Sequence, residues 1–336
     1  MLRQIPRWVT VCCASMLIIL LLVAVFASIP EGGGFDKGHF VVKKGTTAWG
    51  VARGLKKDRL ISSAALFRFS SLLFYRGRIV AGEYELSSNM SIVQIARKMA
   101  LGQRNIYTLK IVEGHNLFDV AENMEKTGFM GRSAFLSLAQ DRDRLRKIGI
   151  AGDSLEGYLT PDTYFYSKET DIEGFIEPIV QRTARLFEKE EIKKRMEELA
   201  LTRDQVICLA SIIEKEAKLE DEKPLISAVF HNRLKTDMSL DADPTVIYGR
   251  RAFKRGLTRV DLTTYTPYNT YLFKGLPKGP ICSPGKSSLL AALYPAKSDA
   301  VYFVSRNDGS HVFSRTINEH NHYVMVYQKN RSRKPQ

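Results

Sequence analysis

The sequence predicts an α+β protein with an N-terminal transmembrane helix, a small α+β module and a larger mixed α/β region. Positions 8–29 carry no charge, strand-like and helix-like patterns alternate up to about residue 200, and helices with Pro-, Asn- and Tyr-rich loops follow. The chain has 336 residues, of which 44% are apolar and 26% charged. Such a composition is expected to fold around a core, in two domains or in one large domain with a small appendage.

The apolar stretch at residues 8–29 is long enough to cross a bilayer, which requires about 20 residues. Two arginines precede it and acidic residues follow, so the positive-inside rule predicts a cytoplasmic tail at 1–7 and an exported remainder. A cleaved signal peptide, with Val25 and Ala27 as the small residues of its cleavage site, is the alternative. The prediction is a single-span anchor.

The exported part begins with a glycine-rich linker at 30–38 and a small α+β module at 39–103. Its last helix is the clearest, because four apolar residues recur there at helical spacing. The expected elements are a strand at 39–42, helices around 49–55 and 64–73, a strand at 78–86 and a helix at 91–101.

A larger region is predicted at 104–328, followed by a basic tail at 329–336. Its first half should contain a strand at 107–112, helices at 117–126 and 132–138, a loop at 155–164, and a helix at 176–199 that Pro178 can break. Thr202 and Gln205 then form a capping box, which starts a helix expected to run to Leu219.

The rest of this region follows from turn and start signals. Pro224 suits the first position of a helix that continues to Leu234. Long loops are expected over 241–284, and Asn307-Asp308-Gly309 predicts a turn. The elements after the loops are a helix at 287–293 and a hairpin with strands at 302–305 and 311–313.

The net charge of +14 comes from scattered lysines and arginines. A solvated basic surface near anionic lipid and an anionic wall polymer is therefore expected, and a nucleic-acid partner is not. Cys208 and Cys282 are exported and could pair, but two cysteines do not make a disulfide framework. No Cys/His spacing resembles a zinc site, so no metal is expected.

Glu216 is the candidate proton-transfer residue. In the helix from Thr202 it follows three aliphatic residues at spacings of three, four and seven, which places it on the apolar stripe, whereas Glu214 lies nearer the edge. Burial raises the pKa of a carboxyl and lets it hold a proton near neutral pH. The alternative is a buried ion pair between Glu216 and an arginine such as Arg233.

The loops at 241–249 and 265–271 have the composition of a sugar-binding surface. Both set tyrosines among Asp, Asn and Thr side chains. Aromatic rings pack against the apolar faces of sugars, and the short polar side chains can hold hydroxyl groups. Alternatively, the tyrosines are the packing anchors that long loops need.

Ten short segments match, in order, the motifs of one known family. They are LEGYL at 155–159, PDTY at 161–164, ASIIEKE at 210–216, VFHNRL at 229–234, DPTVIYG at 243–249, YNTY at 268–271, GLP at 275–277, ICSPG at 281–285, YPAK at 294–297 and YFV at 302–304. The chain thus resembles the endolytic murein transglycosylase family, also called the MltG or YceG-like family, over nearly its whole length.

The resemblance implies a lyase that needs no cofactor and acts on peptidoglycan. Its catalytic residue would be Glu216, the second Glu of the Glu-Lys-Glu run, within a YceG-like catalytic domain at 104–328. The segment 39–103 would be a LysM-like module, which binds glycans containing N-acetylglucosamine. The protein would be a single-pass protein of the cell inner membrane with a periplasmic catalytic domain, would help to end glycan strand growth, and could have peptidoglycan synthases as partners.

The implied reaction cuts between N-acetylmuramic acid and N-acetylglucosamine without water. Glu216 would protonate the glycosidic oxygen and then take the proton from the C6 hydroxyl as a 1,6-anhydro ring closes, so one group acts as acid and then as base. The candidate residues for holding the sugars are Asn232, Asp243, Thr245, Tyr248, Tyr268, Asn269 and Tyr271.

Two other functions remain open from the sequence. One is a hydrolytic muramidase in which Asp241 or Asp243 activates water, because glycosidases ordinarily use two carboxyl groups. The other is a non-catalytic membrane scaffold that binds peptidoglycan. The sequence also leaves open endolytic against exolytic cutting, peptide-stem preference and oligomeric state.

Overall fold

The computed structural model describes residues 9, 12, 14–16, 25–30, 38–87, 89–168 and 170–329. The chain divides into two compact units, one made of 1–107 with 165–171 and the other of 108–164 with 172–336. Most of the predicted span at 8–29 lies outside the described residues, as do the predicted tail at 1–7 and the last seven residues. No helix among the described residues combines the length and the apolar character that crossing a membrane requires.

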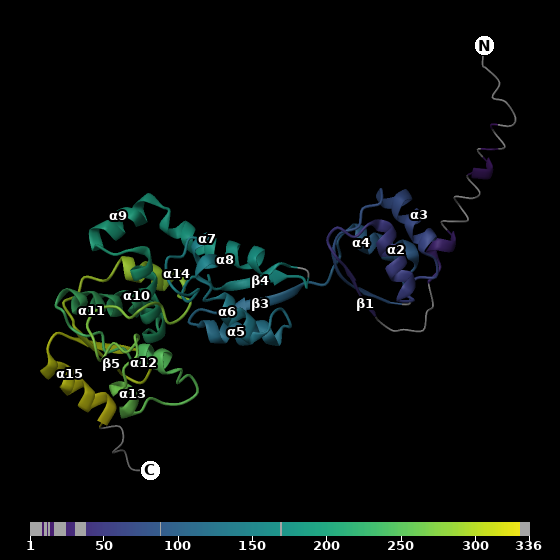
Figure 1. The fold of residues 1–336 in the computed structure, drawn as a ribbon. Helices are drawn as coiled ribbons and strands as arrows, with labels where there is room; N and C mark the ends of the chain where they lie inside the picture. Colours follow the sequence, from purple (N-terminus) through teal and green to yellow (C-terminus); the bar gives the residue numbers. More distant parts are fainter. Residues whose placement is uncertain are drawn as a thin grey trace. The chain divides into compact units, whose positions relative to one another are not determined.

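The first unit is α+β, with three helices packed on a two-stranded antiparallel sheet (Figure 1). Gly38 pairs with Leu86 and Val42 with Gly82, and Phe40 and Tyr84 face the core from this sheet. The elements are β1 (Gly38–Val42), α2 (Ala48–Lys57), α3 (Ala64–Tyr75), β2 (Gly82–Leu86) and α4 (Ile92–Ala100). The predicted helices are confirmed, whereas the second strand begins four residues later than expected, at Gly82.

The second unit consists mainly of helices (Figure 1). Strand β3 (Tyr107–Ile111) pairs with β4 (Asp162–Tyr166), and β5 (Tyr302–Ser305) forms a hairpin with β6 (His311–Ser314). The helices are α5 (Leu117–Lys126), α6 (Arg132–Leu138), α7 (Arg142–Lys147), α8 (Ile172–Phe187), α9 (Glu190–Leu199), α10 (Arg203–Glu216), α11 (Lys223–Lys235), α12 (Asp243–Arg250), α13 (Arg259–Thr263), α14 (Lys286–Leu293) and α15 (Ile317–Val324), with the short turns η1 (Glu220–Glu222) and η2 (Met325–Lys329).

Helix α10 is the central helix of the second unit. It contacts α11, α12 and α14 (Figure 1), and the residues 206–213 are all buried. The predicted capping box is present, with the Thr202 hydroxyl accepting from the Gln205 N–H and the Gln205 side chain accepting from the Thr202 N–H. A helix buried on every side is expected to be apolar all round, so the predicted single apolar stripe is wrong.

Four predicted boundaries in the second unit are wrong. The helix expected at 176–199 is two helices, and the break falls at Lys189, whose backbone is extended, while Pro178 lies inside α8. Helix α10 ends at Glu216 because Ala217 is extended. The loops at 241–284 contain α12 and α13, and the loop at 155–164 runs into β4. These last three elements are short and gain their stability from contacts distant in the sequence.

Candidate active site

Glu216 lies at the last position of α10, where the helix meets the loop that leads to α11. Its side chain is half-buried, and burial raises the pKa of its carboxyl to about 8. The negative charge of Asp243 acts in the same direction, and the positive charge of Arg233 partly offsets both. The C-terminal end of a helix also disfavours a negative charge. Glu216 therefore keeps its proton at neutral pH.

Glu214, two residues earlier on the same helix, has a different role. Its carboxylate accepts hydrogen bonds from the Gly285 N–H at 3.0 Å and the Ser288 hydroxyl at 2.6 Å, and the Lys223 ammonium lies 3.5 Å away. These contacts attach the start of α14 to α10. The side chain of Glu214 is only 10% exposed, so hydrogen bonding, and not burial, distinguishes the two glutamates.

The ion pair between Glu216 and Arg233, which was the alternative from the sequence, does not form. The Arg233 guanidinium donates to the carbonyl oxygens of Val301 and Leu240, both at 2.7 Å, and lies 3.6 Å from the Asp241 carboxylate. Arg233 thus holds the loop before α12. Within the described part of the chain, the Glu216 carboxyl has neither a hydrogen-bond donor nor an ion-pair partner.

Asp243 and Tyr271 form one side of the site. Asp243 opens α12, with Pro244 in the first turn of that helix, and the Tyr271 hydroxyl donates to its carboxylate at 2.7 Å. Both side chains are exposed, α12 packs against α10, and the charge of Glu216 interacts electrostatically with Asp243 and with Tyr271. The structure therefore brings two of the seven predicted sugar-holding residues next to the predicted acid.

The other five predicted residues bond or pack within the protein. Asn232 donates to the carbonyls of Ser298 and Ala300, Thr245 bonds Ala242 and Thr270, and Asn269 donates to three carbonyls around α13. Tyr248 donates to Glu156, and its ring packs against that of Tyr268 with centroids 4.8 Å apart. Their part in sugar binding stays a prediction.

Glu156 is a buried carboxyl that the sequence did not single out. Its Oε2 accepts from the Leu117 N–H at 2.9 Å and the Tyr248 hydroxyl at 2.8 Å, and the residue is 1% exposed. Burial raises its pKa to about 7, although these two donors and the Gly157 N–H act against the shift. Because its partners are distant in sequence, only the LEGYL motif itself could have pointed to it.

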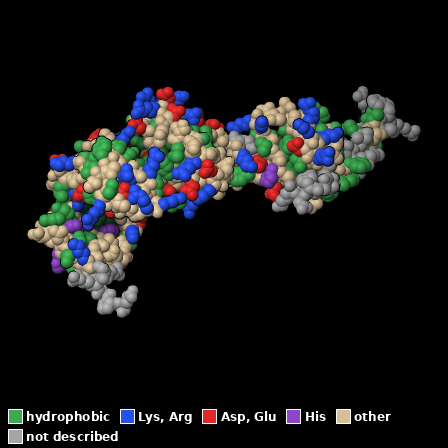
Figure 2. Space-filling model, turned by 60° about the horizontal axis from the view of Figure 1, so that its bottom comes forward, with side chains coloured by type: hydrophobic (Ala, Val, Ile, Leu, Met, Phe, Trp, Pro, Cys, Tyr) green, Lys and Arg blue, Asp and Glu red, His purple; other side chains and the backbone are tan. Residues whose placement is uncertain are grey.

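A half-buried, protonated carboxyl without internal partners can donate a proton to a leaving oxygen and later accept one. Among the described residues, no three His, Cys, Asp or Glu side chains gather as a metal site requires. Basic side chains are scattered over the visible surface with acidic ones among them, and they form no continuous stripe there (Figure 2). The arrangement thus centres on acid–base chemistry at Glu216.

Comparisons with known proteins agree on one family. A model of the YceG-like family matches residues 40–325. The endolytic murein transglycosylase of Bacillus subtilis strain 168 is 30% identical over 298 residues, which cover 83% of this chain and 82% of the relative. That of Streptococcus pneumoniae strain D39 is 26% identical over 323 residues, covering 87% of this chain and 57% of the relative.

A solved structure has the same fold. The crystal structure of a YceG-like protein from Listeria monocytogenes aligns with a TM-score of 0.59 at 31% sequence identity. The alignment covers 86% of this chain and all of that one. The likeness therefore extends over both units of the structure described above.

Proposed function

Because the chain belongs to the YceG-like family, we propose that it is an endolytic murein transglycosylase, a lyase that cuts the glycan strands of peptidoglycan. The observation that carries the proposal is the Glu216 carboxyl, which burial keeps protonated at neutral pH and which lacks a partner within the described residues. Glu216 is also the residue that the family motif selects.

In the proposed reaction Glu216 acts first as an acid and then as a base. Its proton goes to the glycosidic oxygen as the bond from C1 of N-acetylmuramic acid breaks. The C6 hydroxyl oxygen of the same sugar then bonds to C1, and its proton returns to the Glu216 carboxylate. Asp243, whose carboxylate accepts from the Tyr271 hydroxyl and whose charge acts on Glu216, would stabilise the positive charge that develops at the sugar. We assign it this role.

Hydrolysis is the second candidate, and the proximity of Asp243 to Glu216 favours it. Hydrolytic glycosidases usually use two carboxyl groups, one on each side of the glycosidic bond. In that reaction Asp243 would activate water, and the product would carry a reducing end. The Tyr271 hydroxyl already occupies one oxygen of Asp243, which leaves only the other oxygen free to take a proton from water. The transglycosylase reaction is therefore preferred.

Mass spectrometry of digested glycan strands tests the proposal. Wild-type protein should give 1,6-anhydro-muramic ends, and Glu216→Gln should give no cleavage. Glu214→Asp is the matched control on the same helix, and it should keep measurable activity because it retains the charge beside Lys223. Reducing ends as the only products would overturn the proposed reaction, and cleavage by Glu216→Gln would exclude Glu216 as the acid.

Three further assignments are proposed from the sequence and the family. The segment 8–29 anchors the protein in the cell inner membrane with its catalytic unit on the periplasmic side. The first unit is a LysM-like module that binds the glycan, and its succession β1–α2–α3–β2 supports this assignment. Peptidoglycan synthases are partners, because a cut close to the membrane would end strand growth. A reporter enzyme fused after residue 336 should be active only in the periplasm.

A further inference from the structure

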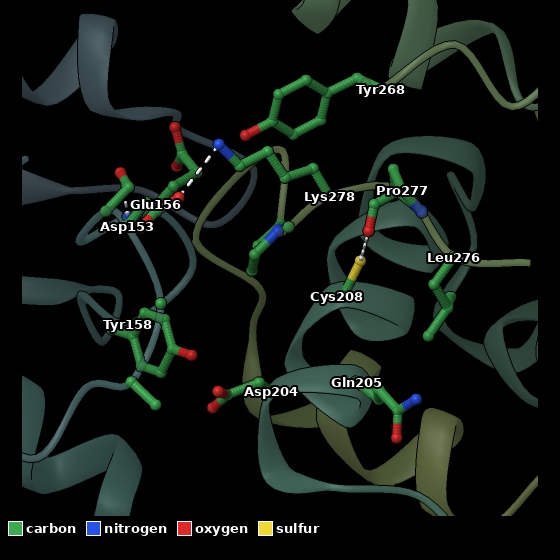
Figure 3. A pocket seen from close by; sticks show the side chains of 15 residues that line it. Asp153, Glu156, Tyr158, Asp204, Gln205, Cys208, Tyr268, Leu276, Pro277 and Lys278 are labelled. Carbon is green, nitrogen blue, oxygen red and sulfur yellow. Dashed lines mark hydrogen bonds and ion pairs between the residues drawn. The ribbon is translucent and has the colours of Figure 1, made fainter.

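A cavity of about 290 Å³ lies in the second unit. The carboxylates of Asp153 and Glu156 line one end together with Lys278 and the Tyr268 hydroxyl, and Asp204 lines the other (Figure 3). Pro277, Leu276 and the buried Cys208 form an apolar wall on one side, and Tyr158 lies on the opposite side (Figure 3). This volume is at the lower limit for small-molecule sites, which suits one ligand of monosaccharide size.

Glu156 lines this cavity, and one of its two carboxyl oxygens is buried without a hydrogen-bond partner among the described residues. Its Oε2 accepts the hydrogen bonds from the Leu117 N–H and the Tyr248 hydroxyl, whereas the buried Oε1 has no hydrogen-bond partner among the described residues. A buried polar atom left without a partner costs free energy, typically about 1–3 kcal/mol. Such an atom beside an open cavity is expected to be satisfied by something that enters the cavity.

The other polar groups at that end define the ligand chemistry. Asp153 is already paired with Lys278 at 3.0 Å and with Arg142 at 2.8 Å, so its charge is neutralised. Glu156 Oε1 can accept from an amide N–H or a hydroxyl, and the Lys278 ammonium can donate to a carbonyl oxygen. An acetamido group offers the N–H and the carbonyl together with a methyl group for the apolar wall.

We propose that this cavity binds one N-acetylhexosamine residue, whose acetamido group donates to Glu156 Oε1 and accepts from Lys278. The inference rests on the proposed function, because it takes peptidoglycan glycan as the ligand. The site is separate from the cutting site: Cys208 lines the cavity and precedes Glu216 by eight residues of α10, or about 12 Å along the helix. A single sugar residue therefore cannot contact both.

Gly152 allows the cavity to be filled without altering Glu156. A Cβ atom built on Gly152 meets nothing closer than 4.0 Å, and its backbone is not in the left-handed region, so Gly152→Leu projects a side chain into free space. Gly256→Leu is the matched control, because a Cβ at Gly256 meets nothing within 4 Å and the residue is exposed outside the cavity.

Hydrogen exchange read by mass spectrometry locates the binding. The full-length protein carrying Glu216→Gln, which prevents cutting, is titrated with the linear tetramer of N-acetylglucosamine. Exchange should slow at 151–158 and 276–280, and the glucose tetramer, which lacks the acetamido groups, should leave these segments unchanged. Adding Gly152→Leu should weaken this protection at least tenfold, and adding Gly256→Leu should not change it.

A kinetic measurement complements the binding experiment. In the protein with Glu216 intact, Gly152→Leu should raise KM for glycan strands about tenfold with kcat little changed. The proposal is overturned if the N-acetylglucosamine tetramer does not slow exchange at the two segments, or if it slows exchange equally with and without Gly152→Leu. It is also overturned if the glucose tetramer slows exchange at these segments to the same degree. None of these results changes the 1,6-anhydro product, so failure of this site is distinguishable from failure of the proposed reaction.

Discussion

Replacing Glu216 by glutamine should stabilise the second unit at neutral pH while abolishing cleavage. Burial raises the pKa of the Glu216 carboxyl from 4.5 to about 8, so the folded protein binds a proton that the unfolded chain does not bind between these pH values. Stability is therefore lost as pH rises through that window, and the loss is complete above the folded pKa. Glutamine imitates the protonated carboxyl and removes this dependence.

The size of the effect follows from the pKa values. A pH of 7 lies about 2.5 units above the pKa of this glutamate in the unfolded chain. At 1.36 kcal/mol per unit, the difference corresponds to about 3 kcal/mol. The half-buried side chain retains some contact with water, so this value is an upper limit and a gain of about 1–3 kcal/mol is expected. At about pH 4 both states are protonated, and the gain should vanish.

Hydrogen exchange of the amides at 206–213 is the suitable assay. These residues are all buried in α10, so their exchange reports on opening of the second unit. Tryptophan fluorescence would not report on it, because both tryptophans lie before residue 50. Glu214→Gln is the paired variant, and it should destabilise by about 1–3 kcal/mol because Lys223 loses the charge of this partner. If Glu216→Gln failed to slow exchange at pH 7, or slowed it equally at pH 4, the reasoning would be refuted.

Three further outcomes are expected. The cleavage rate should fall about tenfold per pH unit above about pH 8, where Glu216 loses its proton, and a rate that keeps rising to pH 10 would contradict the assignment of the acid. Gly157→Ala should lower the free energy of unfolding by about 3 kcal/mol or more, since a Cβ there would lie 2.5 Å from Pro280 and φ is +83°. Gly128→Ala, also at positive φ but in open space, should lower it by about 1 kcal/mol, and urea unfolding measures both. Cys208 and Cys282 are free, and burial raises the pKa of both thiols, so mass spectrometry should detect alkylation only after denaturation, and no disulfide.

The elements predicted best are those whose signals are local. The capping box of Thr202 and Gln205 fixed the start of α10, and the turn at Asn307-Asp308-Gly309 gave the β5–β6 hairpin to within one residue. Helix α12 was missed although Pro244 lies in its first turn, as Pro224 does in α11. The surrounding Tyr, Asn and Thr residues favoured a loop, and only the packing of α12 against α10 decides the matter.

The site was predictable where one residue carried it and unpredictable where distant residues meet. Glu216 was selected by its motif, whereas Arg233 could not be excluded as its partner, because the carbonyls that bind Arg233 lie up to 68 positions away. Glu156 is the extreme case: the partners of its Oε2 lie 39 and 92 positions along the chain. No local pattern reports such a contact.

The two glutamates of α10 explain how the fold tolerates an acid that opposes its stability. A carboxyl held protonated and without a described partner destabilises the folded state above about pH 4.5. The same helix end is fixed by Glu214, whose bonds to Gly285 and Ser288 hold α14 against α10, while 206–213 are buried on every side. Because the backbone under Glu216 is held by these contacts, Glu216 needs no bond of its own to stay in position. A substrate oxygen can therefore be the first partner that its proton meets.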